Sequence, residues 1–434
     1  MIRFKAILSA VIGTLLEHYD AMLYVHFLFI LSPLFFPNED PFITALLGML
    51  SFAVGFVTRP LGGIFFGHIG DRLGRRVALG LSVMFVSIPT FIMGILPTYA
   101  QIGITAPIIL IICRMLQSFC VGGEATGASI FLVEHAAPGR QCLTSSLLNV
   151  SINIGSLMGA GIGLISLNSF FPEWGWRVPF LMGAFFCWFG YYIRTKVGET
   201  PAFQNVMREH KVAKIPLMEV LKSDKIVILR TMGICAGVMA PYQMIYVYMG
   251  DVLRNKLNLP MAEVLSHNMK IMVILIVSLL FMGYLGDKIG FKKVMGGSLL
   301  AIICITYPLF WFIEGTTSPN DVMLMQAVLA FIGSGAGATC CLMSTFFPTK
   351  ERYSGYSFGW ALGSIFFAGF TPLLSLLLVK WTGNETSPAF ILMFCGFLGI
   401  VALTTSKKRY DEKDAAETLP KFISWPEPMK TAGA

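Results

Sequence analysis

The stretch Gly67-His68-Ile69-Gly70-Asp71-Arg72-Leu73-Gly74 recurs later in the chain as Gly283-Tyr284-Leu285-Gly286-Asp287-Lys288-Ile289-Gly290. Its glycines, its aspartate and its first basic residue all recur at one constant displacement of almost half the 434 residues. A looser echo relates Pro138-Gly139-Arg140 to Pro348-Thr349-Lys350-Glu351-Arg352. Similarity between the two halves of a chain predicts two equivalent structural units that arose by duplication.

The composition predicts that these units lie in a membrane. Hydrophobic residues make up 55% of the chain and charged residues 13%, whereas a soluble domain is about 25% charged. Apolar runs such as 43–66 and 77–96 are long enough to cross the hydrocarbon as helices. Since backbone groups in lipid must be satisfied internally, and no alternating β-barrel pattern is present, we expect an all-α integral membrane protein.

Twelve such runs predict twelve transmembrane helices in two pseudo-symmetric six-helix bundles. We expect an N-terminal bundle at 1–195, a linker at 196–228, a C-terminal bundle at 229–406 and a tail at 407–434. The predicted spans are 7–31, 43–66, 77–98, 106–133, 143–168, 178–195, 229–250, 264–285, 293–313, 321–345, 355–379 and 388–406.

The distribution of basic residues predicts the orientation. With the N-terminus inside, most of the 32 Lys and Arg residues fall on the cytoplasmic side, which places both termini in the cytoplasm of a cell (inner or plasma) membrane. The segment 1–16 lacks a small-residue cleavage site and continues as an apolar run, so we interpret it as part of the first membrane helix. The same bias explains the net charge of +8 without nucleic acid as a partner.

Several function classes are disfavoured. The nine cysteines show no metal-ligand spacing, and eight of them fall in apolar runs, so we expect small buried side chains and no metal site. The chain has no P-loop and no HExxH motif. We therefore expect a secondary transporter without a cofactor, driven by an ion gradient, rather than an enzyme; a channel is a rival that the two-fold repeat disfavours.

Several further stretches carry a family resemblance, together with the first repeated turn. They are Glu17-His18-Tyr19-Asp20, Gly55-Phe56-Val57-Thr58-Arg59-Pro60-Leu61-Gly62-Gly63, Arg114-Met115-Leu116-Gln117, Gly122-Gly123-Glu124, Gly175-Trp176-Arg177-Val178-Pro179-Phe180 and Gly198-Glu199-Thr200-Pro201-Ala202-Phe203. The chain resembles the major facilitator superfamily and, within it, the metabolite:proton symporter family. That resemblance implies proton-coupled transport of a small polar metabolite such as proline, betaine, 2-oxoglutarate, citrate or shikimate. The chain departs from the family pattern at Thr14, His18, Ala21 and Ser118.

The intramembrane charges are the candidate functional groups, because a charge near the bilayer centre is costly. Glu17 and Asp20 are spaced i, i+3 and share one face of the first helix. One of them is predicted to carry the proton; the alternative is a fixed ion pair with a basic group of another helix. His18 lies on a different face, either as a titratable gate or as a packed histidine.

The fourth helix carries a second set of polar residues on one stripe. Arg114 suits a substrate carboxylate, with Gln117 beside it, and the alternative for Arg114 is an ion pair with Asp20 or Glu17. Glu124 is a third candidate for proton coupling, or it pairs with Arg59.

The second half contributes candidate substrate contacts. Tyr242, Gln243 and Tyr246 follow Pro241, where we expect the seventh helix to break. The tyrosines could hold a quaternary ammonium group by cation–π attraction or could simply pack. Lys270 is a possible second anion contact, unless it extends to the membrane surface.

The repeated turns are predicted to form a gate. In the superfamily the aspartate, here Asp71, caps a helix of the opposite half, and the basic residues pair with an acid at the inner end of the fourth helix. The resemblance thus implies a cytoplasmic gate that stabilises the outward-facing state, made of Gly67, Asp71, Arg72, Arg75 and Glu134 together with Asp287 and Lys288. The glycine runs 159–163 and 333–337 are interpreted as helix-packing seams.

The predicted function is symport of protons and a small organic acid or zwitterion by alternating access, in a protein that works as a monomer in the bilayer. A proton-independent uniporter or exchanger of the same fold is the first alternative, and a drug/proton antiporter is the second.

Overall fold

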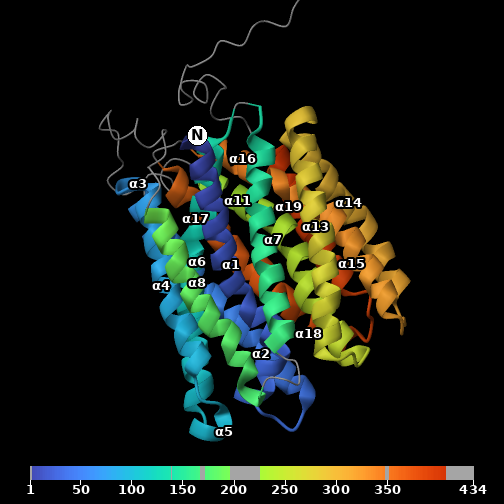
Figure 1. Ribbon diagram of the computed structural model, residues 1–434. Helices are drawn as coiled ribbons and strands as arrows, with labels where there is room; N and C mark the ends of the chain where they lie inside the picture. Colours follow the sequence, from blue (N-terminus) through green and yellow to red (C-terminus); the bar gives the residue numbers. More distant parts are fainter. Residues whose placement is uncertain (1, 138, 167–171, 196–224, 348–350, 407–434) are drawn as a thin grey trace, which may run out of the picture.

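A computed structural model describes residues 2–137, 139–166, 172–195, 225–347 and 351–406, and within them every regular element is a helix. The helices run roughly along one axis (Figure 1). The predicted tail at 407–434 and most of the predicted linker at 196–228 lie outside the described residues, as do the Gly198–Phe203 motif and Pro348, so the domain boundaries stay predictions.

The N-terminal half forms six long rods. Their elements are α1 (Ile2–Phe35), α2 (Pro41–Val57) with α3 (Arg59–Arg72), α4 (Arg75–Ile95), the short α5 (Tyr99–Ile102), α6 (Thr105–His135), α7 (Gln141–Ser166), η1 (Glu173–Trp176) and α8 (Arg177–Thr195). α2 and α3 are parts of one 32-residue helix, Pro41–Arg72. The six predicted spans of this half are therefore present, and each rod overlaps its predicted span.

The C-terminal half repeats this arrangement with more irregular helices. Its elements are α11 (Lys225–Gln243), η2 (Met244–Tyr248), α12 (Met249–Asp251), η3 (Val252–Lys256), α13 (Met261–Ile289), α14 (Phe291–Ile313), α15 (Pro319–Gly333), η4 (Ser334–Ala338), α16 (Thr339–Ser344), α17 (Arg352–Ser364), η5 (Ile365–Gly369), α18 (Thr371–Thr382) and α19 (Pro388–Thr404). The predicted break at Pro241 is wrong in form: α11 runs through the proline and widens to a π-helix at η2.

The lengths and compositions of these rods fit a bilayer. Among the described residues, nine helices are long and apolar enough to cross a membrane, and α19 is a shorter apolar helix. Together with α1 and α8 they make up the twelve membrane helices. Large apolar side chains are exposed along the outer surface, for example Leu61, Trp188 and Trp311, where lipid rather than water would cover them.

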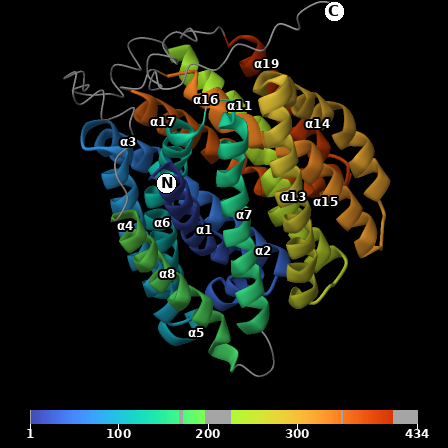
Figure 2. The ribbon, with the colours of Figure 1, turned by 45° about the horizontal axis from the view of Figure 1, so that its top comes forward.

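The two halves lie side by side, and they meet where the orange α17 lies beside α3 and the yellow α13 lies beside α7 (Figures 1 and 2). The successive rods alternate in direction, so the ends of α3 and α13 and the starts of α4 and α14 lie at the end that carries the N-terminus. We call this the basic end, because Arg72, Arg76, Lys288 and Lys293 are exposed there.

The last glycine of each repeated motif makes the turn between helices. Gly74 has a φ of 115° and Gly290 a φ of 98°, values that a residue with a Cβ rarely adopts. Each is the residue before the next rod, α4 or α14. The sequence repeat is therefore a structural repeat.

The two glycine runs lie in helices, as predicted for packing seams. A Cβ on Gly163 would come within 3.0 Å of Phe27, and one on Gly335 within 2.0 Å of Ser298. The cysteines are likewise packed side chains: all nine are free thiols and only Cys304 is exposed.

A close contact between α3 and α6 gives a test of this packing. A Cβ on Gly62 would lie 1.7 Å from the backbone oxygen of Phe119, so we expect Gly62→Ala to force the helices apart and destabilise the protein by about 1–3 kcal/mol. Gly297→Ala is the matched control, because its Cβ would meet no atom within 4 Å. Thermal unfolding of the two purified variants in detergent measures the effect of each substitution. Equal melting temperatures of Gly62→Ala and Gly297→Ala would contradict the close contact between α3 and α6.

Candidate functional site

A cavity of about 140 Å³ lies between the two halves. The N-terminal half lines it from α1, α3, α6 and α7, and the C-terminal half from α11, η2, α13, α15, η4, α16 and α17. Polar lining groups include His18, Arg59, Asn149, Asn153 and Gln243. The volume has room for several water molecules.

Only part of the predicted substrate set lines this cavity. Tyr242 and Gln243 do, and the ring of Tyr246 packs behind Tyr242 with a centroid distance of 4.8 Å. Lys270 is exposed on α13 and is not among the described lining residues, which places it away from the cavity.

Asp20 is the centre of a buried polar network within the N-terminal half. Its Oδ2 accepts a hydrogen bond from the Thr90 hydroxyl at 2.7 Å, and the Gln117 amide nitrogen lies 3.3 Å from it. The Gln117 amide also donates to Thr90 at 2.8 Å. A Cβ added to Gly183 would be 3.2 Å from Asp20 Oδ1, so α8 closes this side of the network.

Arg114 joins the same network but makes no direct ion pair with Asp20. Its guanidinium donates to the Gln117 side-chain oxygen at 2.9 Å and lies 4.2 Å from the centre of the Tyr24 ring. Gln117 therefore bridges the positive and negative groups. Both charges are at least 97% buried, which makes the protonation state of Asp20 sensitive to small changes in this network.

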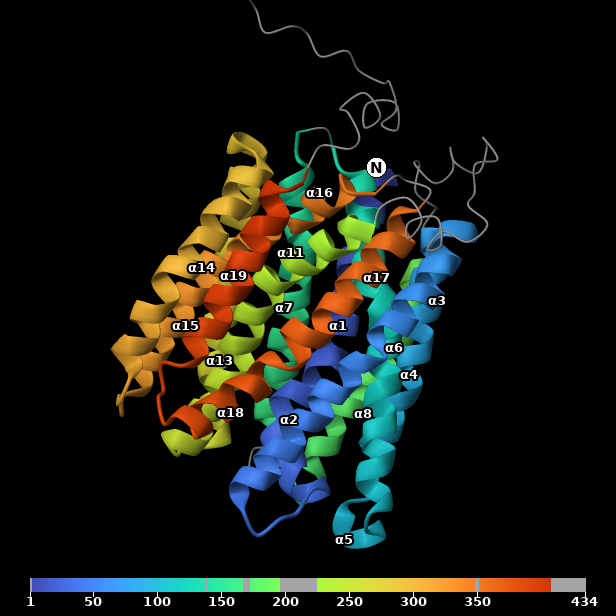
Figure 3. The same cartoon turned by 180° about the vertical axis from the view of Figure 1, so that it is seen from behind.

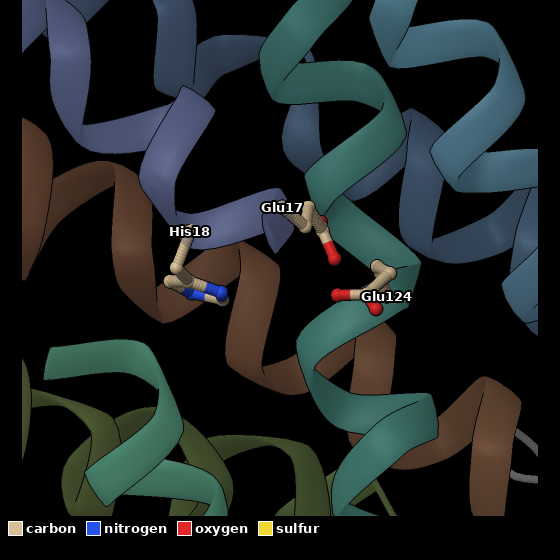
Figure 4. A group of neighbouring side chains, drawn as sticks. All are labelled: Glu17, His18 and Glu124. Atoms are coloured by element: carbon tan, nitrogen blue, oxygen red, sulfur yellow. The ribbon is translucent and has the colours of Figure 1, made fainter. Parts of the chain in front are cut away.

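Glu17, His18 and Glu124 form a second buried group (Figure 4). One ligand atom from each lies within 4.8 Å of the others. Glu17 and Asp20 share a helix face as predicted, yet they face two different groups: the first faces α6 at Glu124 and the second faces Thr90 and Gln117. The set could hold a proton or, by its donor atoms, a metal ion.

Arg59 does not pair with Glu124. In the described part of the chain no carboxylate lies within ion-pair distance of its guanidinium, which instead lies 3.8 Å from the centre of the Phe56 ring. The alternative of a Glu124–Arg59 pair is thus not what the structure shows.

The first repeated turn docks onto a helix of the opposite half at the basic end. Asp71 Oδ2 accepts a hydrogen bond from the backbone N–H of Ser354 at 2.9 Å, at the start of α17. Asp71 Oδ1 lies 3.0 Å from Arg75. A Cβ on Gly67 would be 2.9 Å from Ser354 Cα, so glycine is needed for this approach. Figure 3 shows α17 beside α3.

The second repeated turn makes the equivalent contact in the other direction. Asp287 accepts hydrogen bonds from the backbone N–H groups of Cys142 at 2.8 Å and Leu143 at 3.0 Å, at the start of α7. A Cβ on Gly283 would be 2.5 Å from the Ser146 hydroxyl oxygen. Each half therefore places a carboxylate at the amino end of a helix in the other, where it is stabilised.

One detail of the predicted gate is corrected. Glu134 pairs with Arg352 of the opposite half at 3.2 Å, not with Arg72 or Arg75. Arg75 follows Asp71 by one turn and bonds locally to it and to the Gly70 carbonyl. Arg72 is exposed beside His68, and Lys288 is exposed over the Tyr284 ring.

Comparisons with known proteins agree with this architecture. Residues 6–225 match the family described as sugar (and other) transporters, and residues 269–430 match the major facilitator superfamily. A proline/betaine transporter of Salmonella typhimurium is 31% identical over 421 residues, which cover 93% of this chain and 83% of the relative. The chain belongs to the major facilitator superfamily.

Two further superfamily members are informative. A citrate-proton symporter of Klebsiella pneumoniae is 29% identical over 92% of this chain and 91% of its own. A solved structure of the proton:xylose symporter XylE superposes with a TM-score of 0.73 at 17% identity, over 93% of this chain and 94% of that one. The relatives confirm the resemblance to metabolite:proton symporters, and the chain is a transporter rather than an enzyme.

Two functional features were missed in the sequence of this superfamily member. Arg59 was noted as an intramembrane charge but not as a lining residue, although its position before Pro60, where a helix begins, was a usable signal. The Glu134–Arg352 pair was also not predicted. The second echo ends at Arg352, but nothing in the sequence indicated that this residue would lie beside the end of the fourth helix.

The gate can be tested with a native thiol. We expect Asp287→Asn to remove the carboxylate that accepts from the Cys142 and Leu143 backbone N–H groups and to weaken the closed basic end by about 1–3 kcal/mol. Cys142 is buried at this interface, so its maleimide labelling should accelerate about tenfold or more, measured by mass spectrometry. Asp321→Asn, at the start of α15 at the opposite end, is the control. Unchanged labelling of Cys142 in Asp287→Asn would exclude this contact as part of the gate.

Proposed function

We propose that this protein is a proton-coupled symporter of a small organic acid or zwitterion. The observation that carries the proposal is the Asp20–Gln117–Arg114 network, a buried acid and base joined by one amide. A buried acid that is joined to a base through an amide, without a direct ion pair, can change between its charged and neutral forms, which is what a proton carrier requires. The named transport functions of the relatives, proline/betaine and citrate-proton transport, support the same class.

Alternating access provides the transport cycle in this proposal. The cavity lies between the halves, and the contacts of Asp71 and Asp287 close it at the basic end. Protonation of Asp20 would release the Gln117–Arg114 part of the network, and the halves would then rock about the cavity. Glu17 and Glu124 are further proton-coupling candidates, beside His18.

We place the protein in the inner (plasma) membrane with the basic end and both termini in the cytoplasm, because basic residues concentrate there. The closed basic end then corresponds to a closed cytoplasmic gate. The protein works as a monomer, with substrate and protons as its partners and no cofactor beyond the proton gradient.

The proton-coupling residue can be identified by comparing accumulation with exchange. In proteoliposomes with an inward pH gradient of one unit, one coupled proton supports about tenfold accumulation. We expect labelled proline, glycine betaine or citrate to accumulate in wild type, and only to equilibrate in Asp20→Asn. Counterflow against internal unlabelled substrate should survive in the variant, because exchange needs no net proton movement.

Asp40→Asn is the matched control, because Asp40 caps α2 outside the network and asparagine is an equally good cap. Gradient-driven accumulation that persists in Asp20→Asn would remove Asp20 as the carrier and leave Glu17 or Glu124. Equilibration of every compound by wild type would favour the uniporter or exchanger alternative.

A further inference from the structure

Arg59 occupies an unusual position in the N-terminal half. It is the first residue of α3, next to Pro60, at the junction where α2 ends. Thr58, just before it, uses its hydroxyl to donate to the Met115 carbonyl of α6 at 2.6 Å, so the junction is anchored to a second helix. The Arg59 side chain therefore extends from a fixed point into the cavity between the halves.

No acid among the described residues forms a direct ion pair with Arg59, although the Glu17 carboxylate attracts its charge from a greater distance. Among the described residues its guanidinium has no ion pair, its Nε atom is buried without a hydrogen-bond partner, and its one recorded contact is the Phe56 ring. The described residues that line the cavity include no Asp or Glu. The Arg59 side chain is half-buried, and withdrawing a guanidinium from water without a paired anion is costly. The cavity is the space from which an anion can reach it.

The other basic candidates are less suitable. Arg114 does not line the cavity, and the Gln117 oxygen occupies one of its donors. Lys270 is exposed on α13. His18 also lines the cavity, but its ring lies 3.1 Å from the Thr14 carbonyl and beside Glu17 and Glu124. Arg59 is therefore the permanently charged group of the described cavity wall that is available to a ligand.

We propose that Arg59 binds the carboxylate of the transported substrate, an inference that rests on the proposed symport function and specifies its substrate class. A guanidinium fork matches a carboxylate bidentately. Tyr356 and Trp360, whose rings meet edge to face in the cavity wall, provide a surface for the rest of the molecule. Asn153 Oδ1 is buried without a partner in the described structure and can accept from a hydroxyl or amine. The ligand class is a small carboxylate.

Binding to the purified protein tests this inference separately from transport. Isothermal titration calorimetry would compare proline with prolinol, glycine betaine with choline, and citrate with its triamide. We expect wild type to bind at least one carboxylate and to prefer it over its partner, and Arg59→Gln to weaken that binding about tenfold to a hundredfold. The preference for carboxylate should disappear in Arg59→Gln and return in part in Arg59→Lys, a pattern that a structural defect would not produce.

Lys293→Gln is the matched control, since it removes one exposed positive charge at the start of α14. Melting temperatures of all variants check folding. Equal affinity of wild type for carboxylates and their neutral partners, no binding of any carboxylate, or unchanged discrimination in Arg59→Gln would each overturn the assignment. If Arg59 discriminated carboxylates from their neutral partners but no gradient-driven uptake occurred, the Arg59 assignment would hold and proton symport would be overturned.

Discussion

The structure depends on a reciprocal contact in which each half caps a helix of the other with a carboxylate. Asp71 reaches the amino end of α17, and Asp287 reaches that of α7. Both contacts need glycine one turn earlier, at Gly67 and Gly283, since a side chain there would collide with the facing helix. The repeated sequence is therefore conserved between the halves for one geometric purpose: to bring the end of one helix against the start of another.

The two contacts are not equal in strength. Asp71 is fully buried and has Arg75 as an ion-pair partner, and the Glu134–Arg352 pair joins α6 to the same helix, α17. Asp287 is half-buried and relies on backbone N–H groups. On the α17 side the halves are also joined by the Glu134–Arg352 ion pair, so we infer that the α7–α13 side separates first when the basic end opens.

The fold could be predicted from sequence because its causes are local. Apolar runs of membrane length give each helix regardless of its neighbours, and the repeat gives the two halves. The candidate site was harder to predict from the sequence, because which polar side chains pair depends on how the helices pack. A spacing of i, i+3 placed Glu17 and Asp20 on one face, but it could not show that α6 and α4 would separate them into two groups. Lys270 and Arg114 had the right chemistry, and only packing showed that neither lines the cavity.

The charged groups near the cavity lie in one half only, which limits how proton binding can be coupled to movement of the other half. The described acidic and arginine side chains at or beside the cavity all belong to the N-terminal half: Glu17, Asp20, Arg59, Arg114 and Glu124. The C-terminal half contributes mainly aromatic, amide and small residues. A proton bound in the N-terminal half therefore cannot act on the other half through a direct ion pair at the cavity. It can act by changing how α1 and α6 pack, and a substrate held by Arg59 and covered by Tyr356 and Trp360 would then transmit that change to α17. Because α17 also carries the capped amino end and Arg352, movement of this one helix links cavity occupancy to the gate.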